Sequence, residues 1–472
     1  MNITAREIAI AAGGRIVCGN GDVSASGVST DTRTECEGRL FVPLSGENFD
    51  GHDYIDVAYA RGASVALTSR GDAGGGIVPI NAALIQVGDT LEALGKLASW
   101  YRLKFRPLVV GVTGSVGKTT TKEMIALVLS KKFNVLKSEG NKNNEIGLPL
   151  TIFGLTGEHT ALVLEMGMNN PGEIARLSKI ARPDIAVITN IGDAHIKRLG
   201  SKQNILKAKL EILEGLSKNG TVYLNGDDML LKGLMGLIDR PVVYYGIDDG
   251  LDFTGTDIRM KGGRGLEFEF TWRRRGYGVT LNAAGEHNVH NALAAVSIGI
   301  ENGVTPKQIK EALYEFIPDR LRMNISSSGG VVIINDTYNA NPQSMRAAVD
   351  VLAGLSGDGR RIAVLGDMLE LGDFAGERHR EIGAYLKDRG VDVLVAAGAY
   401  AADVASGANG AAAQVNGGKR VDCHIFGGRE GVAEYVLDIV KPGDMVMIKG
   451  SRAMQMDRVA EAVEKAIGRS DC

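Results

Sequence analysis

Cysteine is scarce in this chain of 472 residues, which has four cysteines and no C-x-x-C pair among them. Four widely separated cysteines are too few to staple a chain of this size, and their spacing does not suit a structural zinc ion. We therefore expect neither disulfides nor a zinc site, which fits a reducing compartment.

Long apolar runs and an excess of positive charge are also missing. No run of about eighteen apolar residues occurs, and the first residues lack a basic segment followed by an apolar core. The formal net charge of -3 offers no basic surface to nucleic acid or to an anionic membrane. We therefore expect a cytoplasmic enzyme that binds neither and that holds anionic ligands at local sites.

A glycine-rich turn follows the apolar run 108–110, and the rest of the chain is organised around it. Its spacing is G-x-x-G-x-x-G-K-T-T, so Val112 stands where the general P-loop pattern has a glycine. Glycines let backbone N–H groups face an anion, Lys118 can reach terminal phosphates, and the Thr119 hydroxyl can bind Mg²⁺. A tight turn that serves packing alone is the alternative, but the strand, the Lys-Thr pair and the helix expected over 122–130 favour a nucleoside triphosphate site. The loop consists of Gly111, Val112, Thr113, Gly114, Ser115, Val116, Gly117, Lys118, Thr119 and Thr120.

Beyond the loop, short apolar runs at 161–164, 185–188 and 221–224 alternate with helical stretches, including a long helix expected over 201–216. This rhythm predicts a mainly parallel sheet whose ligands lie beyond the carboxyl ends of its strands. Glu165 ends the first run, where a carboxylate suits Mg²⁺ binding or water positioning, unless it is a surface residue. His195 follows the second run, but a lone histidine is more often structural than a ligand.

Two polar clusters mark residues 1 to 84. They interleave glycine with Asp, Asn and His, which can hydrogen-bond a polar ligand, although the same composition is typical of ordinary turns. The pattern leaves both interpretations open. The clusters contain Asp31, Arg33, Gly46, Asn48 and His52.

The remainder of the chain continues the alternation of strands and helices. A hairpin is expected over 265–281, and Asn288 and Asn291 share one face of the helix that follows, where they could read a base edge or cap the helix. Five βα units after residue 318 predict a C-terminal domain of dinucleotide-fold type without a G-x-G-x-x-G fingerprint, so NAD is not implied. Residues 406–419 are expected to form a surface loop.

Together these motifs resemble the Mur ligase family, and within it the members that add D-alanyl-D-alanine. The stretches that carry the resemblance run through the chain in order. They are the loop at 111–120, G-N-K-N-N-E-I-G-L-P at 140–149, E-M-G-M-N at 165–169, G-x-H-N-x-x-N at 285–291, N-D-T-Y-N-A-N-P-x-S-M at 335–345, G-D-M-L-E-L-G at 366–372 and K-G-S-R at 449–452.

The resemblance implies an ATP-dependent ligase of peptidoglycan synthesis with ATP and Mg²⁺ as cofactors. ATP would phosphorylate the carboxylate of UDP-MurNAc-tripeptide, and the amine of D-Ala-D-Ala would attack the acyl phosphate. Either lysine or diaminopimelate can stand third in the tripeptide. The expected fold class is α/β with three domains in a monomer. They are a small UDP-substrate-binding domain at 1–84, a central P-loop domain with a mainly parallel sheet at 85–316 and a Rossmann-like ligase domain at 317–472.

The resemblance also implies roles residue by residue. Lys118, Lys209 and His195 would be catalytic, and Lys209 matches a carbamylated lysine of the family, with Lys207 close in register and an ordinary solvated lysine as the alternative. The implied metal ligands are Thr119, Glu165, His195 and Lys209. The implied ATP contacts beyond the loop are His287, Asn288, Asn291, Asp336 and Arg322, with Arg320 as the alternative to Arg322. The implied substrate contacts are Asp31, Arg33, Gly46, Asn48 and His52 for the uridine nucleotide, and Asn143, Asn144, Asn339 and Asn341 elsewhere.

Two other functions compete with this interpretation. A folylpolyglutamate synthase-like ligase shares the P-loop and Mg²⁺ scheme but acylates glutamate, and it lacks a UDP-binding first domain. A P-loop regulatory switch would bind nucleotide without making a product, and the motifs at 339–342 and 449–452 argue against it.

Overall fold

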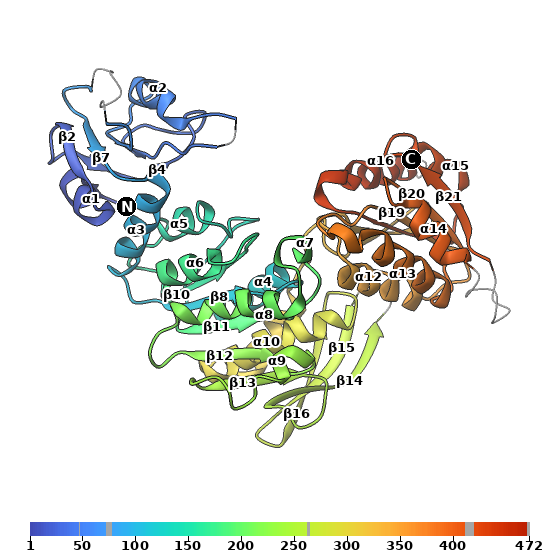
Figure 1. The fold of residues 1–472 in the computed structure, drawn as a ribbon. Helices are drawn as coiled ribbons and strands as arrows, with labels where there is room; N and C mark the ends of the chain where they lie inside the picture. The colour runs from blue at the N-terminus through green and yellow to red at the C-terminus, as the bar shows by residue number, and fades with distance from the viewer. Residues whose placement is uncertain (47, 72–77, 262–264, 411–419, 470–472) are drawn as a thin grey trace. The chain divides into compact units, whose positions relative to one another are not determined.

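The computed structural model describes residues 1–46, 48–71, 78–261, 265–410 and 420–469 (Figure 1). It forms two compact units. The first contains Met1–Thr113, Lys132–Val187 and Ala208–Val222, and the second contains Gly114–Lys131, Ile188–Lys207 and Tyr223–Cys472. Within the described ranges, no helix combines the length and the apolar character needed to cross a membrane.

The N-terminal part of the first unit is built on a five-stranded sheet with the order β2-β7-β6-β5-β4. The strands β4 to β7 are parallel and β2 is antiparallel at one edge. The strands are β2 (Arg15–Gly19), β4 (Val28–Ser29), β5 (Leu40–Phe41), β6 (Val65–Thr68) and β7 (Ala83–Gln86), and β1 (Ile3–Thr4) pairs with β3 (Ser24–Ala25). The helical segments are α1 (Ala5–Ala12), η1 (Gly51–Tyr54) and α2 (Ile55–Ala60).

A nine-stranded sheet follows, with the order β16-β15-β14-β13-β12-β11-β8-β10-β9. β10 is parallel to β8 and to β9, and every residue of β10 is buried, as expected of an apolar run inside a parallel sheet. The strands are β8 (Leu108–Thr113), β9 (Val135–Lys137), β10 (Ala161–Glu165), β11 (Ile185–Ile188), β12 (Thr221–Asn225), β13 (Val242–Gly246), β14 (Phe253–Lys261), β15 (Gly265–Trp272) and β16 (Arg275–Leu281).

The hairpin expected near residue 273 is present and is formed by β15 and β16, which pair antiparallel. Arg273 and Arg274 form its two-residue turn, and both have positive φ angles, 50° and 61°. Two successive left-handed residues match the right-handed twist of the flanking strands. β14 also pairs antiparallel with β15, so this end of the mainly parallel sheet is antiparallel.

The helices between these strands mostly lie where the sequence predicts them. The long helix expected over 201–216 is an exception: α8 ends at Leu210 and a 3₁₀ turn, η2, continues. The Glu211 carboxylate accepts hydrogen bonds from the N–H groups of Gly172 and Ala175, so it caps α6 and turns the chain away from the helical path. The segments are α3 (Thr90–Arg102), α4 (Lys118–Ser130), α5 (Gly147–Ile152), α6 (Glu173–Ala181), α7 (Ile196–Leu199), α8 (Lys202–Leu210), η2 (Glu211–Glu214), α9 (Met229–Lys232), α10 (His287–Glu301) and α11 (Pro306–Tyr314).

The C-terminal part is a six-stranded sheet with the order β17-β18-β22-β19-β20-β21. All five predicted parallel strands are present, and β17 is an additional antiparallel edge strand. The strands are β17 (Asn324–Ser328), β18 (Val331–Asp336), β19 (Arg361–Gly366), β20 (Val393–Ala397), β21 (Asp422–Phe426) and β22 (Met445–Lys449). The segments between them are α12 (Pro342–Gly354), η3 (Gly372–Phe374), α13 (Ala375–Asp388), α14 (Ala401–Asn409), α15 (Val432–Ile439), η5 (Arg452–Met454) and α16 (Met456–Arg469).

Helices cover both faces of this C-terminal sheet. α15 and α16 pack on one face, where Val436 and Val463 join β-strand residues such as Val364 in one core, and α12 to α14 lie on the other face (Figure 1). α14 extends through Asn409, so the loop expected from 406 begins later. Its alanine-rich sequence has high helix propensity. Residues 411–419 of that expected loop lie outside the described residues, as does the turn that three successive glycines predict at 74–76.

Candidate active site

The glycine-rich loop begins where the buried strand β8 ends. Gly114 has a φ of 149°, and a Cβ there would lie 1.9 Å from Thr189 Oγ1. Gly117 has a φ of 82°, and its Cβ would lie 2.6 Å from Asn291 Oδ1. Both positions therefore require glycine, because a side chain would force apart the segments that enclose the loop.

Asn190, just beyond β11, holds the middle of this loop. Its Oδ1 accepts the N–H of Val116 at 2.9 Å and its Nδ2 donates to the Val116 carbonyl at 3.0 Å. The ammonium of Lys118 donates to the Gly114 carbonyl at 2.9 Å, so the lysine lies over the loop. Asn190 was not among the predicted site residues, although its place after a strand neighbouring β8 was a usable signal.

Asn288 and Asn291 are buried on α10 and form a chain of side-chain hydrogen bonds toward α4. Thr121 Oγ1 donates to Asn291 Oδ1 at 2.9 Å, Asn291 Nδ2 donates to Asn288 Oδ1 at 2.9 Å, and Asn288 Nδ2 donates to the Ala284 carbonyl at 2.7 Å. Neither residue caps the helix. Their amides fix α10 against the helix that begins at the loop.

His287 opens α10, and its ring lies beside Gly285, where a Cβ would be 2.4 Å from the ring. Burial lowers the pKa of His287 to about 4, which keeps the imidazole neutral at pH 7.

We expect this histidine to make the protein acid-sensitive. The folded-state pKa lies below the usual 6.5, so the unfolded chain binds more protons and stability falls as the pH drops from about 6.5 toward 4. The loss should reach roughly 1–3 kcal/mol. Urea unfolding of wild type and His287→Asn at several pH values tests this, because the variant should lose part of that slope. An unchanged slope would contradict the assignment.

Glu165 and Lys209 are both buried in the first unit. The exposed fraction of Glu165 is 2 %, so it is not a surface residue, and Asn143 Nδ2 donates to its Oε1 at 2.8 Å. Lys209 is 1 % exposed, whereas Lys207 is exposed. Asn144 accepts the N–H groups of Ile146 and Gly147, which organises the start of α5.

The C-terminal candidates lie at the ends of β18 and β22. Asp336 Oδ2 accepts a hydrogen bond from the buried Lys449 ammonium at 2.5 Å, and its Oδ1 accepts the N–H of Met323 at 3.0 Å. The guanidinium of Arg322 lies 3.6 Å from the centre of the Tyr338 ring, while Arg320 pairs with Glu461 on the surface. Asp336 thus fixes the loop that carries both arginines.

Asn339 and Asn341 have local partners at the start of α12. Asn341 is the N-cap, and its Oδ1 accepts the N–H of Ser344 at 2.9 Å. The Asn339 carbonyl accepts from Lys449 at 2.8 Å, and its side chain accepts the N–H of Ala340. The asparagine-rich turn is therefore held by its own side chains and by Lys449 at the end of β22.

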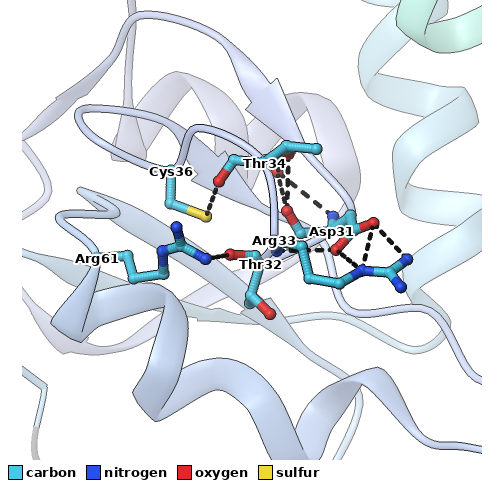
Figure 2. Close-up of polar contacts among 7 residues, drawn as sticks. Asp31, Thr32, Arg33, Thr34, Cys36 and Arg61 are labelled. Atoms are coloured by element: carbon cyan, nitrogen blue, oxygen red, sulfur yellow. Dashed lines mark hydrogen bonds and ion pairs between the residues drawn. The ribbon is translucent and has the colours of Figure 1, made fainter.

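The first N-terminal cluster is a tight polar turn (Figure 2). Arg33 folds back on Asp31, which lowers the pKa of that carboxyl to about 2, and Arg61 donates to the Thr32 carbonyl. A cavity of about 270 Å³ lies beside the turn, close to the lower end of ligand pocket sizes. It is lined by Val28, Ser29, Thr30, Asp31, Thr34, Glu35, Arg39 and Leu150.

The second N-terminal cluster divides into buried and exposed members. His52 is buried; its Nδ1 contacts Asp50 at 2.6 Å, and its Nε2 accepts the N–H of Ser69 at 3.0 Å. These partners fix the neutral tautomer with the proton on Nδ1. Asn48 is exposed, and Gly46 lies beneath the ring of Phe49.

We expect Asn48→Ala and His52→Ala to behave differently. Asn48→Ala should raise the KM for a UDP-linked substrate severalfold and leave the KM for ATP unchanged, because Asn48 is exposed and belongs to the part built on the five-stranded sheet, not to the sheet that carries the phosphate loop. His52→Ala should in addition cost roughly 1–3 kcal/mol of stability, because it removes a buried ring together with its contacts to Asp50 and Ser69. Steady-state kinetics measure the effects on KM, and urea unfolding measures the loss of stability. A selective rise in the KM for ATP in either variant would contradict the assignment of these residues to the UDP-linked substrate.

Three family models match successive parts of the chain: "Mur ligase family, catalytic domain" over residues 24–102, "Mur ligase middle domain" over 112–299 and "Mur ligase, glutamate ligase domain" over 321–452. The chain is also 37 % identical over 436 residues to the UDP-N-acetylmuramoyl-tripeptide--D-alanyl-D-alanine ligase of Bacillus subtilis, covering 92 % of each protein. It belongs to the Mur ligase family.

Other Mur ligases extend this similarity. The Escherichia coli protein of the same name is 36 % identical over 94 % of this chain and 95 % of its own length. A crystal structure of MurF from Acinetobacter baumannii has a TM-score of 0.88, with 30 % identity over 98 % of this chain and 99 % of that one. A MurF ligase structure from Thermotoga maritima, described as a complex with ADP, has a TM-score of 0.82, with 31 % identity over 94 % and 98 % of the two chains. The expected three-domain α/β fold class is thus confirmed.

Proposed function

We propose that this Mur ligase joins D-alanyl-D-alanine to UDP-MurNAc-tripeptide with conversion of ATP to ADP and phosphate. The observation that carries the proposal is the similarity to ligases of that name over more than nine-tenths of both chains. The loop geometry at 114–118 supports it, because two obligatory glycines and a lysine enclose a site suited to phosphate groups.

The reaction has two steps, phosphorylation of the tripeptide carboxylate and attack of an amine on the resulting acyl phosphate. A carboxylate oxygen of the tripeptide attacks the γ-phosphorus of ATP, and the bond to ADP breaks. The amine nitrogen of D-alanyl-D-alanine then attacks the acyl carbon, the bond from that carbon to the phosphate oxygen breaks, and the nitrogen loses a proton. A free carboxylate is a poor electrophile, so the first step supplies the leaving group that the second needs.

The chain's own residues have three tasks in this scheme. The backbone N–H groups of the loop and Lys118 bind the phosphates, and Asn190 keeps the loop in its binding shape. The buried amides of α10 hold the helix that begins at the loop. Arg322 and Asp336 supply the ATP contacts from the C-terminal part, and the clusters around Asp31 and Asn48 bind the uridine nucleotide.

The donor chemistry present suits Mg²⁺. The buried carboxylate of Glu165 and the hydroxyl of Thr119 are hard oxygen ligands, and His195 adds a nitrogen. Lys209 fits only if its ammonium is converted to a carbamate, because a buried cation would repel the metal. Bound Mg²⁺ supplies charge neutralisation on the phosphates. Glu165 and Thr119 would hold one ion, and His195 and carbamylated Lys209 a second.

The proposal also covers the location of the enzyme, its oligomeric state and its domains. The enzyme works in the cytoplasm as a monomer. Its three domains are bounded near residues 84 and 316, and the first of them binds the UDP-substrate.

Phosphate release from purified enzyme tests the proposal. Release should require ATP, a UDP-tripeptide and D-alanyl-D-alanine together, and parallel assays with lysine and diaminopimelate in the third position show which tripeptide is used. Release that needs a folate and glutamate instead would favour the folylpolyglutamate synthase-like function. Nucleotide binding without any substrate-dependent release would favour a switch.

A further inference from the structure

The loop after β11 and the loop after β19 are joined side chain to side chain in the second unit. His195 Nδ1 lies 2.7 Å from Glu370 Oε2. The N–H of Lys197 donates to the Glu370 carbonyl at 3.2 Å, and Arg378 Nε lies 3.7 Å from Asp193 Oδ2. These loops are more than 170 positions apart in sequence, so only the fold brings them together.

The backbone at both ends of this contact is unusual. His195 has a φ of 63° and Glu370 a φ of 64°, although neither is glycine. A left-handed conformation at such residues costs free energy and persists where the surrounding structure requires it. Both residues adopt this backbone at the point where their side chains meet.

The contact with Glu370 involves one of the two ring nitrogens of His195, Nδ1. Nδ1 of His195 is buried and lies 2.7 Å from Glu370 Oε2, and among the described residues it has no hydrogen bond of regular geometry. A carboxylate beside Nδ1 favours the tautomer with the proton on that nitrogen, which leaves the lone pair of Nε2 for a ligand. A carboxylate that orients a histidine in this way also makes the imidazole a better metal ligand.

We propose that Glu370 is a positioning residue that fixes the ring orientation and tautomer of His195 so that Nε2 serves as the metal-binding nitrogen. This inference rests on the proposed function, in which His195 binds a second Mg²⁺. Glu370 lies in the loop after β19 of the C-terminal sheet, and His195 lies in the loop after β11 of the central sheet. A residue next to one sheet would therefore orient a metal ligand next to another. Glu370 itself would touch neither substrate nor metal.

Manganese titration of the enzyme bound to a non-hydrolysable ATP analogue, followed by electron paramagnetic resonance, measures the effect. Wild type should bind two Mn²⁺ ions. Glu370→Ala should lower the affinity for the second Mn²⁺ by about 10- to 100-fold. Glu370→Gln keeps an oxygen beside Nδ1, so it should recover part of that affinity. Asp373→Asn is the matched control, because it removes an exposed negative charge three positions away and should leave both ions unchanged.

Nitrogen NMR of the histidine rings, recorded without metal, gives a second measurement. Its result should not change if Glu370 only stabilises the fold. Wild type should show His195 protonated on Nδ1, and Glu370→Ala should show a mixture of tautomers at an unchanged melting temperature. Equal affinity for the second Mn²⁺ in Glu370→Ala and wild type would overturn the inference. Two unperturbed Mn²⁺ sites in His195→Ala would instead overturn the metal role of His195 in the proposed function.

Discussion

Lys118→Ala is expected to reduce the rate of ligation by about a thousandfold or more, because Lys118 supplies the mobile positive charge at the phosphate loop. The corresponding loss of transition-state stabilisation is roughly 4 kcal/mol. Its ammonium donates to the loop carbonyls of Gly114 and Ser115, so the substitution should act on phosphate binding. Initial rates of phosphate release at saturating substrates measure the effect.

Lys132→Ala is the matched control for this experiment. Lys132 is an exposed lysine just beyond the other end of α4, and its removal changes the net charge equally. The control should keep wild-type rates, and melting temperatures recorded for both variants identify any loss of folded protein. Wild-type turnover by Lys118→Ala would contradict the phosphate-loop assignment.

Lys209→Ala is expected to lose most activity and to regain part of it when formate or acetate is added. Lys209 is 1 % exposed, and a buried ammonium beside two cations and a substrate carboxylate would oppose catalysis. Reaction with CO₂ replaces the cation with an anion whose two oxygens suit Mg²⁺. A small carboxylate that enters the space left by the side chain would supply similar oxygens.

Lys207→Ala is the control, because Lys207 lies two positions earlier on the same helix and is exposed. It should retain near wild-type activity. Wild-type enzyme incubated with ¹³C-labelled bicarbonate should show a carbamate carbon signal in its ¹³C NMR spectrum. The Lys209→Ala enzyme should lack that signal. Full activity of Lys209→Ala, or loss of activity in Lys207→Ala alone, would show that the modified lysine is assigned wrongly.

Features encoded by neighbouring residues could be predicted from the sequence. The phosphate loop follows from an apolar strand, spaced glycines and a lysine within one short stretch, and the β15–β16 hairpin follows from the alternating pattern on either side of three arginines. The N-cap role of Asn341 also had a local signal, because Asn followed by Pro and then Ser two residues later is typical of a helix start.

Features that depend on distant partners could not be predicted in this way. The helix expected through residue 216 ends early because Glu211 caps α6, which lies more than 30 residues away in sequence. Lys449 bonds to Asp336 across 113 residues, and nothing near either one indicates the pair. The choice between Lys207 and Lys209 likewise depends on which one the surrounding fold buries.

Oxygen transfer from substrate to phosphate tests the central claim most directly. UDP-MurNAc-tripeptide labelled with ¹⁸O in its terminal carboxylate is incubated with the enzyme, ATP and D-alanyl-D-alanine, and the released phosphate is analysed by mass spectrometry. A carboxylate that is phosphorylated and then attacked by an amine leaves one of its oxygens on phosphorus. The account predicts one ¹⁸O atom in each phosphate released, matched by one molecule of pentapeptide product, whereas unlabelled phosphate would contradict it.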